Sequence, residues 1–77
     1  MNVEDLIGKK IADNVSKMES LTAEVKRIDE TNSKTENIHA LIHNGGEIYR
    51  LEIMIELYVQ ANNDLLEILS AYRQKQG

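Results

Sequence analysis

Residues 48–72 read IYRLEIMIELYVQANNDLLEILSAY, and this stretch decides the fold of the chain. Sixteen of its 25 residues are Ala, Val, Ile, Leu, Met or Tyr. On a helical wheel one facing helix covers a stripe of about 100°. Seven polar side chains of this helix gather in one arc roughly 80° wide: Glu52, Glu56, Gln60, Asn63, Glu67, Ser70 and Gln74. The apolar arc is therefore wider than a single neighbouring helix covers, which predicts a second partner for this segment.

The composition predicts one all-α domain over residues 1–77. The chain has no Pro, Cys, Trp or Phe and only four Gly, so little in it interrupts a helix. Its 29% charged and 42% hydrophobic residues are typical of a folded protein. Because a chain this short buries a small core, it often gains stability by associating with another chain.

A heptad pattern predicts a first helix over residues 3–43. Asn2 precedes it as a candidate N-cap, and the acids Glu4 and Asp5 suit the positive end of a helix. The spacing alternates four and three residues, which averages to the period of a coiled coil. The seam positions are Ile7, Ile11, Asn14, Met18, Leu21, Val25, Ile28, Asn32, Thr35, His39 and Ile42.

Residues 29–37 are all polar and leave two interpretations open. Either one long helix carries a polar layer that fixes its register, or the helix breaks near 29–33 and the chain forms three helices. The capping-box pattern Ser33-x-x-Glu36 supports the break. The absence of Gly and Pro from the segment favours the continuous helix.

Asn44-Gly45-Gly46 predicts the turn of an antiparallel hairpin, because Asn and Gly accept the left-handed conformation that ends many helices. The second helix then covers residues 47–75. Folding at 44–46 places Asn32 beside Tyr58, whose hydroxyl would pair with the buried amide. The predicted seam of this helix is Leu51, Met54, Tyr58, Ala61, Leu65, Ile68 and Tyr72.

A second apolar stripe flanks that seam and has no partner in the predicted hairpin. It consists of Ile48, Ile55, Val59 and Leu66. Four residues beside it complete the predicted interface with another chain: Tyr58, Leu65, Leu69 and Tyr72. Burial of this surface predicts an oligomeric helical bundle with coiled-coil-like heptads.

Several functions are disfavoured by the sequence. The net charge of −4, without a basic patch, argues against nucleic-acid binding. His39 and His43 have the i,i+4 spacing of a zinc-binding helix, but no Cys or His-Glu-x-x-His motif supplies further ligands, so structural roles are expected. No serine lies in a nucleophile elbow, and Gly45-Gly46 lacks the Lys of a phosphate loop. We therefore predict no enzyme activity, metal, cofactor or small-molecule substrate.

The N-terminal residues do not form a signal peptide, and the longest apolar runs are three residues long. These features predict a cytoplasmic protein that does not enter membranes. A protein secreted without a leader has the same features.

The layout of two helices around Asn44-Gly45-Gly46 resembles type III secretion needle subunits and the small helical-hairpin chaperones of that apparatus. Needle subunits carry a Pro in the turn, which this chain lacks. The stretch 59–67 is similar to the C-terminal helix of flagellar and type III rod proteins. The resemblance implies a helical hairpin, and no functional residue is carried over from it.

The leading hypothesis is a non-enzymatic protein that self-associates through an apolar face of its C-terminal helix. The alternative is a protein that binds a different protein, such as a small chaperone, a secretion-apparatus subunit or a phage- or plasmid-type regulator. Under both hypotheses the partner is a protein.

Overall fold

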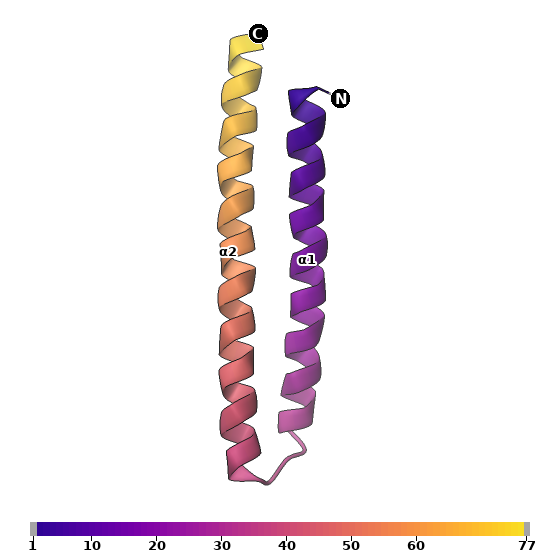
Figure 1. The fold of residues 1–77 in the computed structure, drawn as a ribbon, viewed down its shortest axis with the longest axis vertical. Helices are drawn as coiled ribbons and strands as arrows, with labels where there is room; N and C mark the ends of the chain where they lie inside the picture. The colour runs from indigo at the N-terminus through magenta and orange to yellow at the C-terminus, as the bar shows by residue number, and fades with distance from the viewer. Residues whose placement is uncertain (1, 77) are drawn as a thin grey trace.

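The chain folds as an antiparallel hairpin of two long helices (Figure 1). A computed structural model describes residues 2–76. Helix α1 spans Val3–Asn32 and helix α2 spans Ile38–Gln76, and the start of α1 lies at the same end of the molecule as the end of α2. The molecule is elongated, measuring 59 × 16 × 13 Å. The predicted all-α hairpin is confirmed. Neither described helix contains an apolar stretch long enough to cross a membrane.

Helix α1 begins where the sequence predicted and turns the predicted face to α2. Oδ1 of Asn2 accepts a hydrogen bond from the backbone N–H of Asp5 at 2.8 Å, which satisfies one of the unpaired donors of the first turn. The seam residues of α1 are buried or half-buried along its whole length: Ile7, Ile11, Asn14, Met18, Leu21, Val25, Ile28 and Asn32. The heptad spacing therefore identified this face correctly.

The turn of the hairpin lies at residues 33–37, and the prediction of a turn at 44–46 was wrong. Helix α2 runs through residues 44–46 without interruption, and no described glycine has a positive φ. The local turn signal of Asn44-Gly45-Gly46 was therefore outweighed by contacts elsewhere in the hairpin.

The helix bounds move with the turn. The first helix, predicted to run to residue 43, ends at Asn32, and the second, predicted to start at residue 47, begins at Ile38. The alternative of a break near 29–33 came closer to the position of the turn, but the described chain forms two helices and not three.

Side-chain hydrogen bonds end helix α1 without the help of glycine or proline. The Ser33 hydroxyl donates to the carbonyl of Glu30 at 2.7 Å, and the Thr35 hydroxyl donates to the carbonyl of Thr31 at 2.9 Å. The last carbonyls of a helix lack the N–H partners that a further turn would supply, and these hydroxyls donate to two of them. The Thr31 carbonyl also accepts from the backbone N–H of Lys34 at 3.1 Å. Ser33 therefore closes α1 and does not start a capping box with Glu36.

Asn37 caps the start of helix α2. Its Oδ1 accepts hydrogen bonds from the backbone N–H groups of His39 at 2.9 Å and Ala40 at 3.2 Å. A polar segment rich in Ser, Thr and Asn thus supplies both a helix end and a helix start, which is why five residues suffice for the turn.

Helix α2 turns a different face to α1 from the one predicted. Ten of its buried and half-buried positions follow a three-and-four spacing: Leu41, Asn44, Ile48, Leu51, Ile55, Tyr58, Asn62, Leu65, Leu69 and Tyr72. Ala40, Glu47 and Ala61 are half-buried beside this line. Met54 and Ile68 were predicted in the seam but are 39% and 55% exposed. The helix is turned by about half of the 100° between successive residues, roughly 50°, from its predicted orientation.

Two pairs of asparagines fix this orientation and the register of the hairpin. Nδ2 of Asn14 donates to Oδ1 of Asn62 at 2.8 Å between the helices. Near the turn, Nδ2 of Asn44 donates to Oδ1 of Asn32 at 2.8 Å, so the predicted pairing of Asn32 with Tyr58 was wrong. Asn14 is only 2% exposed, and a buried amide without a hydrogen-bond partner would cost about 1–3 kcal/mol. The register that pairs the amides is therefore strongly favoured.

The apolar core between the helices is thin. The buried apolar residues of the described chain are Ile7, Ile28, Leu51 and Leu69. The rest of the seam remains half-exposed, because each helix covers only one side of the other. The hairpin alone therefore leaves much of its apolar surface in contact with water.

Candidate protein-interaction surface

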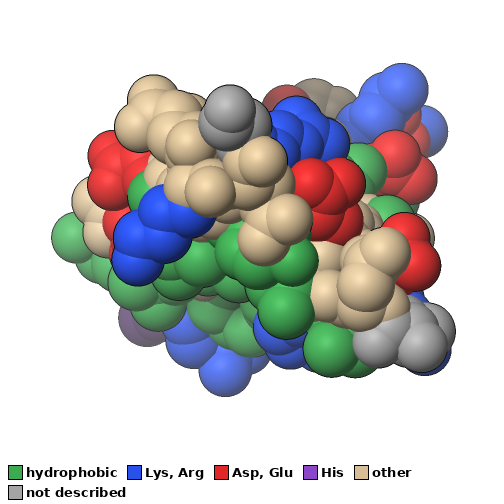
Figure 2. Space-filling model, turned by 90° about the horizontal axis from the view of Figure 1, so that it is seen from above, with side chains coloured by type: hydrophobic (Ala, Val, Ile, Leu, Met, Phe, Trp, Pro, Cys, Tyr) green, Lys and Arg blue, Asp and Glu red, His purple; other side chains and the backbone are tan. Residues whose placement is uncertain are grey.

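Helix α2 carries an apolar surface on a side that α1 does not cover. We term it the outer α2 surface, and it consists of the exposed residues Tyr49, Ile53, Met54, Leu57 and Ile68 together with the half-buried Ala61 at its edge. Tyr49 is 69% exposed and Leu57 is 61% exposed. In the end-on view of Figure 2, hydrophobic side chains reach the surface between the charged ones. Single exposed apolar residues are ordinary, whereas a contiguous group of this kind is typical of a binding surface.

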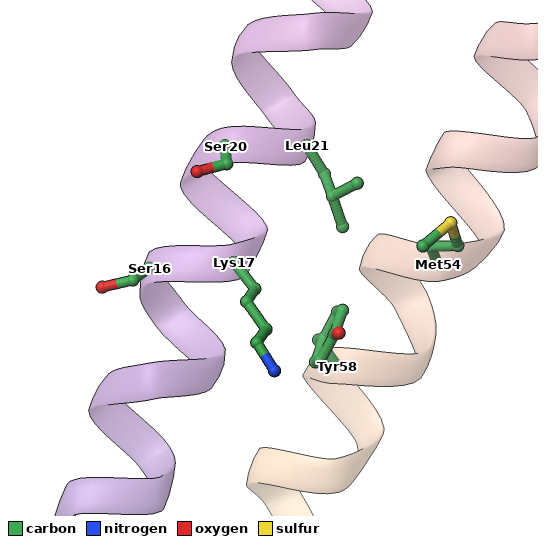
Figure 3. A pocket seen from close by; sticks show the side chains of 6 residues that line it. All are labelled: Ser16, Lys17, Ser20, Leu21, Met54 and Tyr58. Atoms are coloured by element: carbon green, nitrogen blue, oxygen red, sulfur yellow. The ribbon is translucent and has the colours of Figure 1, made fainter.

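This surface continues into a groove between the two helices (Figure 3). The residues lining the groove are Ser16, Lys17, Ser20 and Leu21 of α1 and Met54 and Tyr58 of α2. The Lys17 side chain points toward Tyr58, and its Nζ lies 5.7 Å from the centroid of the ring, within the range of a cation–π contact. Because Met54 lines the groove and also belongs to the outer α2 surface, the two regions form one continuous apolar area.

Carboxylates border the outer α2 surface on its far side. Glu52 and Glu56 line a shallow depression together with Tyr49, Ile53 and Leu57. An apolar centre with a charged border is the usual composition of a protein interface.

Arginine–glutamate ion pairs at i,i+3 spacing occur once on each helix. Arg27 binds Glu24 on α1, and Arg50 binds Glu47 on α2. The hydrogen bond from Arg27 lowers the pKa of Glu24, and the same bond raises the pKa of Arg27. All four side chains reach solvent, so these pairs contribute little to stability. Further along α2, Asp64 is exposed and forms no ion pair within residues 2–76.

Most of the predicted interface residues lie between the helices of the hairpin. Six of the eight are buried or half-buried on the side facing α1: Ile48, Ile55, Tyr58, Leu65, Leu69 and Tyr72. Ile48 and Ile55 are therefore not surplus, because α1 already covers them. Val59 and Leu66 remain exposed, at 40% and 51%, on the opposite flank of α2 from Met54. Their role in an intermolecular interface stays a prediction.

Sequence reasoning missed the outer α2 surface because it assigned Met54 and Ile68 to the seam. The signal that could have found it is the matching of Asn14 with Asn62. Once these two amides are paired, the side of α2 that faces α1 is determined, and Met54 falls outside it. His39 and His43 do not belong to the outer α2 surface.

His39 and His43 are both exposed in the first turns of α2. No group of three or more His, Cys, Asp or Glu side chains in the described chain is arranged to hold a metal ion. His43 lines a polar groove with Glu24 and Glu47, among other residues. The buried polar side-chain atoms of residues 2–76 all have hydrogen-bond partners.

We expect EDTA to leave the helicity and the thermal melting curve of the protein unchanged. Zinc bound at His39 and His43 would contribute directly to the free energy of folding, so its removal would lower the melting temperature. Circular dichroism melts with and without EDTA, and after addition of ZnCl₂, make the measurement. A fall of many degrees with EDTA that ZnCl₂ reverses would show that these histidines hold a metal.

Comparison of the chain with known proteins gives no match, whether against family models, curated proteins or solved structures.

Proposed function

We propose that this protein is a non-enzymatic interaction protein that binds through the outer α2 surface. The first partner we propose is a second copy of the same chain, so that two hairpins associate into a helical bundle. A cytoplasmic location is part of the proposal.

The exposure of large apolar side chains on α2 is the observation that carries this proposal. Leu57 is 61% exposed and Ile68 is 55% exposed, although both are residues that proteins usually bury. Full burial of a Leu, Ile or Met side chain contributes about 1.5–3 kcal/mol. Burial of this surface against a partner would thus supply several kcal/mol, which is comparable to the total stability of many small domains.

The thin core of the hairpin supports association as well. Two helices with four buried apolar residues gain less from their own packing than a larger domain does. Small chains without disulfides or metals commonly gain the missing stability from an oligomer. A second copy covers the same surface on both partners, so association raises the stability of each hairpin.

A different protein is the second candidate partner, and the carboxylate border supports it. Glu52 and Glu56 flank Tyr49, Ile53 and Leu57, an arrangement that suits an amphipathic helix with basic residues beside its apolar stripe. In that case the protein would act as a small chaperone, a secretion-apparatus subunit or a phage- or plasmid-type regulator. The mass of the purified protein in solution separates the two candidates.

We expect Leu57→Glu to dissociate the assembly into monomers while the helices stay folded. A buried carboxylate at the centre of an apolar interface is strongly unfavourable, whereas on a free hairpin it lies in water. Sedimentation equilibrium measures the mass, and circular dichroism measures the helicity.

Leu66→Glu is the matched control, since Leu66 is similarly exposed on the opposite flank of the same helix. Because the outer α2 surface does not include Leu66, we expect this variant to sediment like the unmodified protein, whereas the interface predicted from the sequence would make it dissociate. Dissociation by Leu66→Glu but not by Leu57→Glu would move the interface to the flank of Val59 and Leu66. A monomeric unmodified protein at high concentration would favour a different protein as the partner.

A further inference from the structure

Three residues on the outside of α2 lie on one line along the helix. Arg50, Leu57 and Asp64 are seven residues apart, which brings side chains back to nearly the same face after two turns. All three are exposed. Leu57 thus stands midway between a cation and an anion, with Ile53, Met54 and Ala61 around it. The cation, Arg50, also pairs with Glu47 on its own helix, and both of these side chains reach solvent. This surface is therefore complementary to the same surface of a second copy whose α2 runs in the opposite direction.

We propose that the outer α2 surface binds the α2 helix of a second copy in antiparallel orientation, with the two-fold axis passing beside Leu57. The proposal rests on self-association as the proposed function and adds the orientation and register of the contact. In a two-fold interface each pairing occurs twice. A rotation about Leu57 brings Leu57 against the partner's Leu57 and Arg50 against the partner's Asp64 on both sides.

The charges select the antiparallel orientation. A parallel contact in register would bring Arg50 against the partner's Arg50 and Asp64 against the partner's Asp64, and like charges across an interface are unfavourable. The antiparallel contact turns both repulsions into attractions. The apolar residues between the charges supply the affinity, whereas the charged ends determine orientation and register.

The same rotation also matches the apolar side chains by size. Residues equally far from Leu57 on its two sides come together, so Ile53 meets the partner's Ala61. A large side chain therefore packs against a small one on each side of the axis, which lets two helices approach closely. Helix α1 lies beside this contact and contributes Lys17 to its border through the groove at Tyr58.

Charge reversal tests the orientation. Arg50→Asp alone places Asp against Asp at both ends of the contact, and Asp64→Arg alone places Arg against Arg. We expect each single variant to weaken the dimer roughly 10-fold to 100-fold in its dissociation constant, because two exposed ion pairs become two repulsions. The double variant R50D/D64R restores the attractions with their signs exchanged, and its dissociation constant returns to within about 3-fold of the unmodified value. An equimolar mixture of the two single variants should also associate, because every charge then faces its opposite.

Arg27→Asp is the matched control for these variants. It also breaks an exposed i,i+3 ion pair with a glutamate, but on α1 and away from the proposed contact. We expect the Arg27→Asp dimer to be as tight as that of the unmodified chain. Circular dichroism melts of every variant verify that the hairpin itself is intact.

Cysteine cross-linking provides a second measurement, because the natural chain contains no Cys. Leu57→Cys places two thiols beside the two-fold axis, where they come close enough for a disulfide. Mild oxidation should give a covalent dimer, whereas Lys26→Cys, on the outside of α1, should form no disulfide-linked dimer under the same conditions.

The outcomes separate this inference from the function on which it rests. A dimer weakened by each single reversal and restored by the double variant and by the mixture supports the antiparallel contact. An unmodified dimer whose affinity the single reversals leave unchanged overturns the orientation and leaves self-association standing. An unmodified protein that is monomeric at the highest concentration overturns both.

Discussion

Asn14→Ala is expected to lower the free energy of unfolding by about 2–3 kcal/mol, because it leaves Oδ1 of the buried Asn62 amide without its hydrogen-bond donor. Asn14 is 2% exposed and donates to Asn62 Oδ1 at 2.8 Å, whereas Asn62 Nδ2 keeps its own bond to the carbonyl of Ile11 at 3.3 Å. The substitution also leaves a small cavity in the seam. Urea unfolding followed by circular dichroism, at one fixed protein concentration, measures the change.

The double variant N14L/N62L distinguishes two causes of the lost stability. One is the cost of an unpaired buried amide, and the other is the loss of the Asn14–Asn62 contact itself. Replacing both members of a buried polar pair with apolar residues is often neutral or stabilising, so we expect the double variant to be at least as stable as the unmodified protein. Asn32→Ala is the control, since its pair with Asn44 is only half-buried and water can reach it. Its cost should be about 1 kcal/mol. A double variant as unstable as Asn14→Ala would contradict this account of the pair.

The second large effect has the opposite sign. G45A/G46A is expected to stabilise the hairpin by about 1.5–2 kcal/mol, because each glycine inside a helix costs about 0.8–1 kcal/mol relative to alanine. Both residues lie within α2, and a Cβ at either position meets no atom within 4 Å. Thermal and urea unfolding at fixed protein concentration give the magnitude.

Gly8→Ala in α1 is the matched control, since Gly8 is helical and equally open. It should contribute about 1 kcal/mol and calibrates the value of one glycine in this protein. If the chain instead turned at 44–46, alanine would be forced into a left-handed conformation, and G45A/G46A would destabilise the protein. The sign of the change therefore decides the position of the turn.

The face of α1 could be predicted from the sequence because its stripe has only one interpretation. The seam residues from Ile7 to Ile28 are spaced by three and four, all but Asn14 are apolar, and most of the residues between them are polar. Helix α2 is apolar over a wider arc, so the spacing alone allows two neighbouring faces. The choice between them depends on the pairing of Asn14 with Asn62, which lie 48 residues apart in the chain.

The turn could not be predicted from local signals because a stronger non-local interaction opposed them. Two glycines inside a helix cost about 2 kcal/mol together. A turn at 44–46 would place the Asn62 amide opposite Ile28, and an unpaired buried amide costs about 1–3 kcal/mol. The capping hydrogen bonds of Ser33, Thr35 and Asn37 lower the free-energy cost of a turn without glycine at residues 33–37.

The two asparagine pairs also determine the order in which the hairpin can close. Asn32 and Asn44 are 12 residues apart, whereas Asn14 and Asn62 are 48 apart. Each doubling of the length of a loop adds about 0.6 kcal/mol to the entropy cost of closing it. The Asn32–Asn44 pair beside the turn therefore forms first, and the helices then pair progressively toward the chain ends. A helix that starts zipping one heptad out of register proceeds until Asn14 meets an apolar residue such as Ile55 or Leu69. The distant pair thus penalises a wrong register late in folding, when Asn14 becomes buried. A misaligned hairpin must then separate its helices before it can reach the native register.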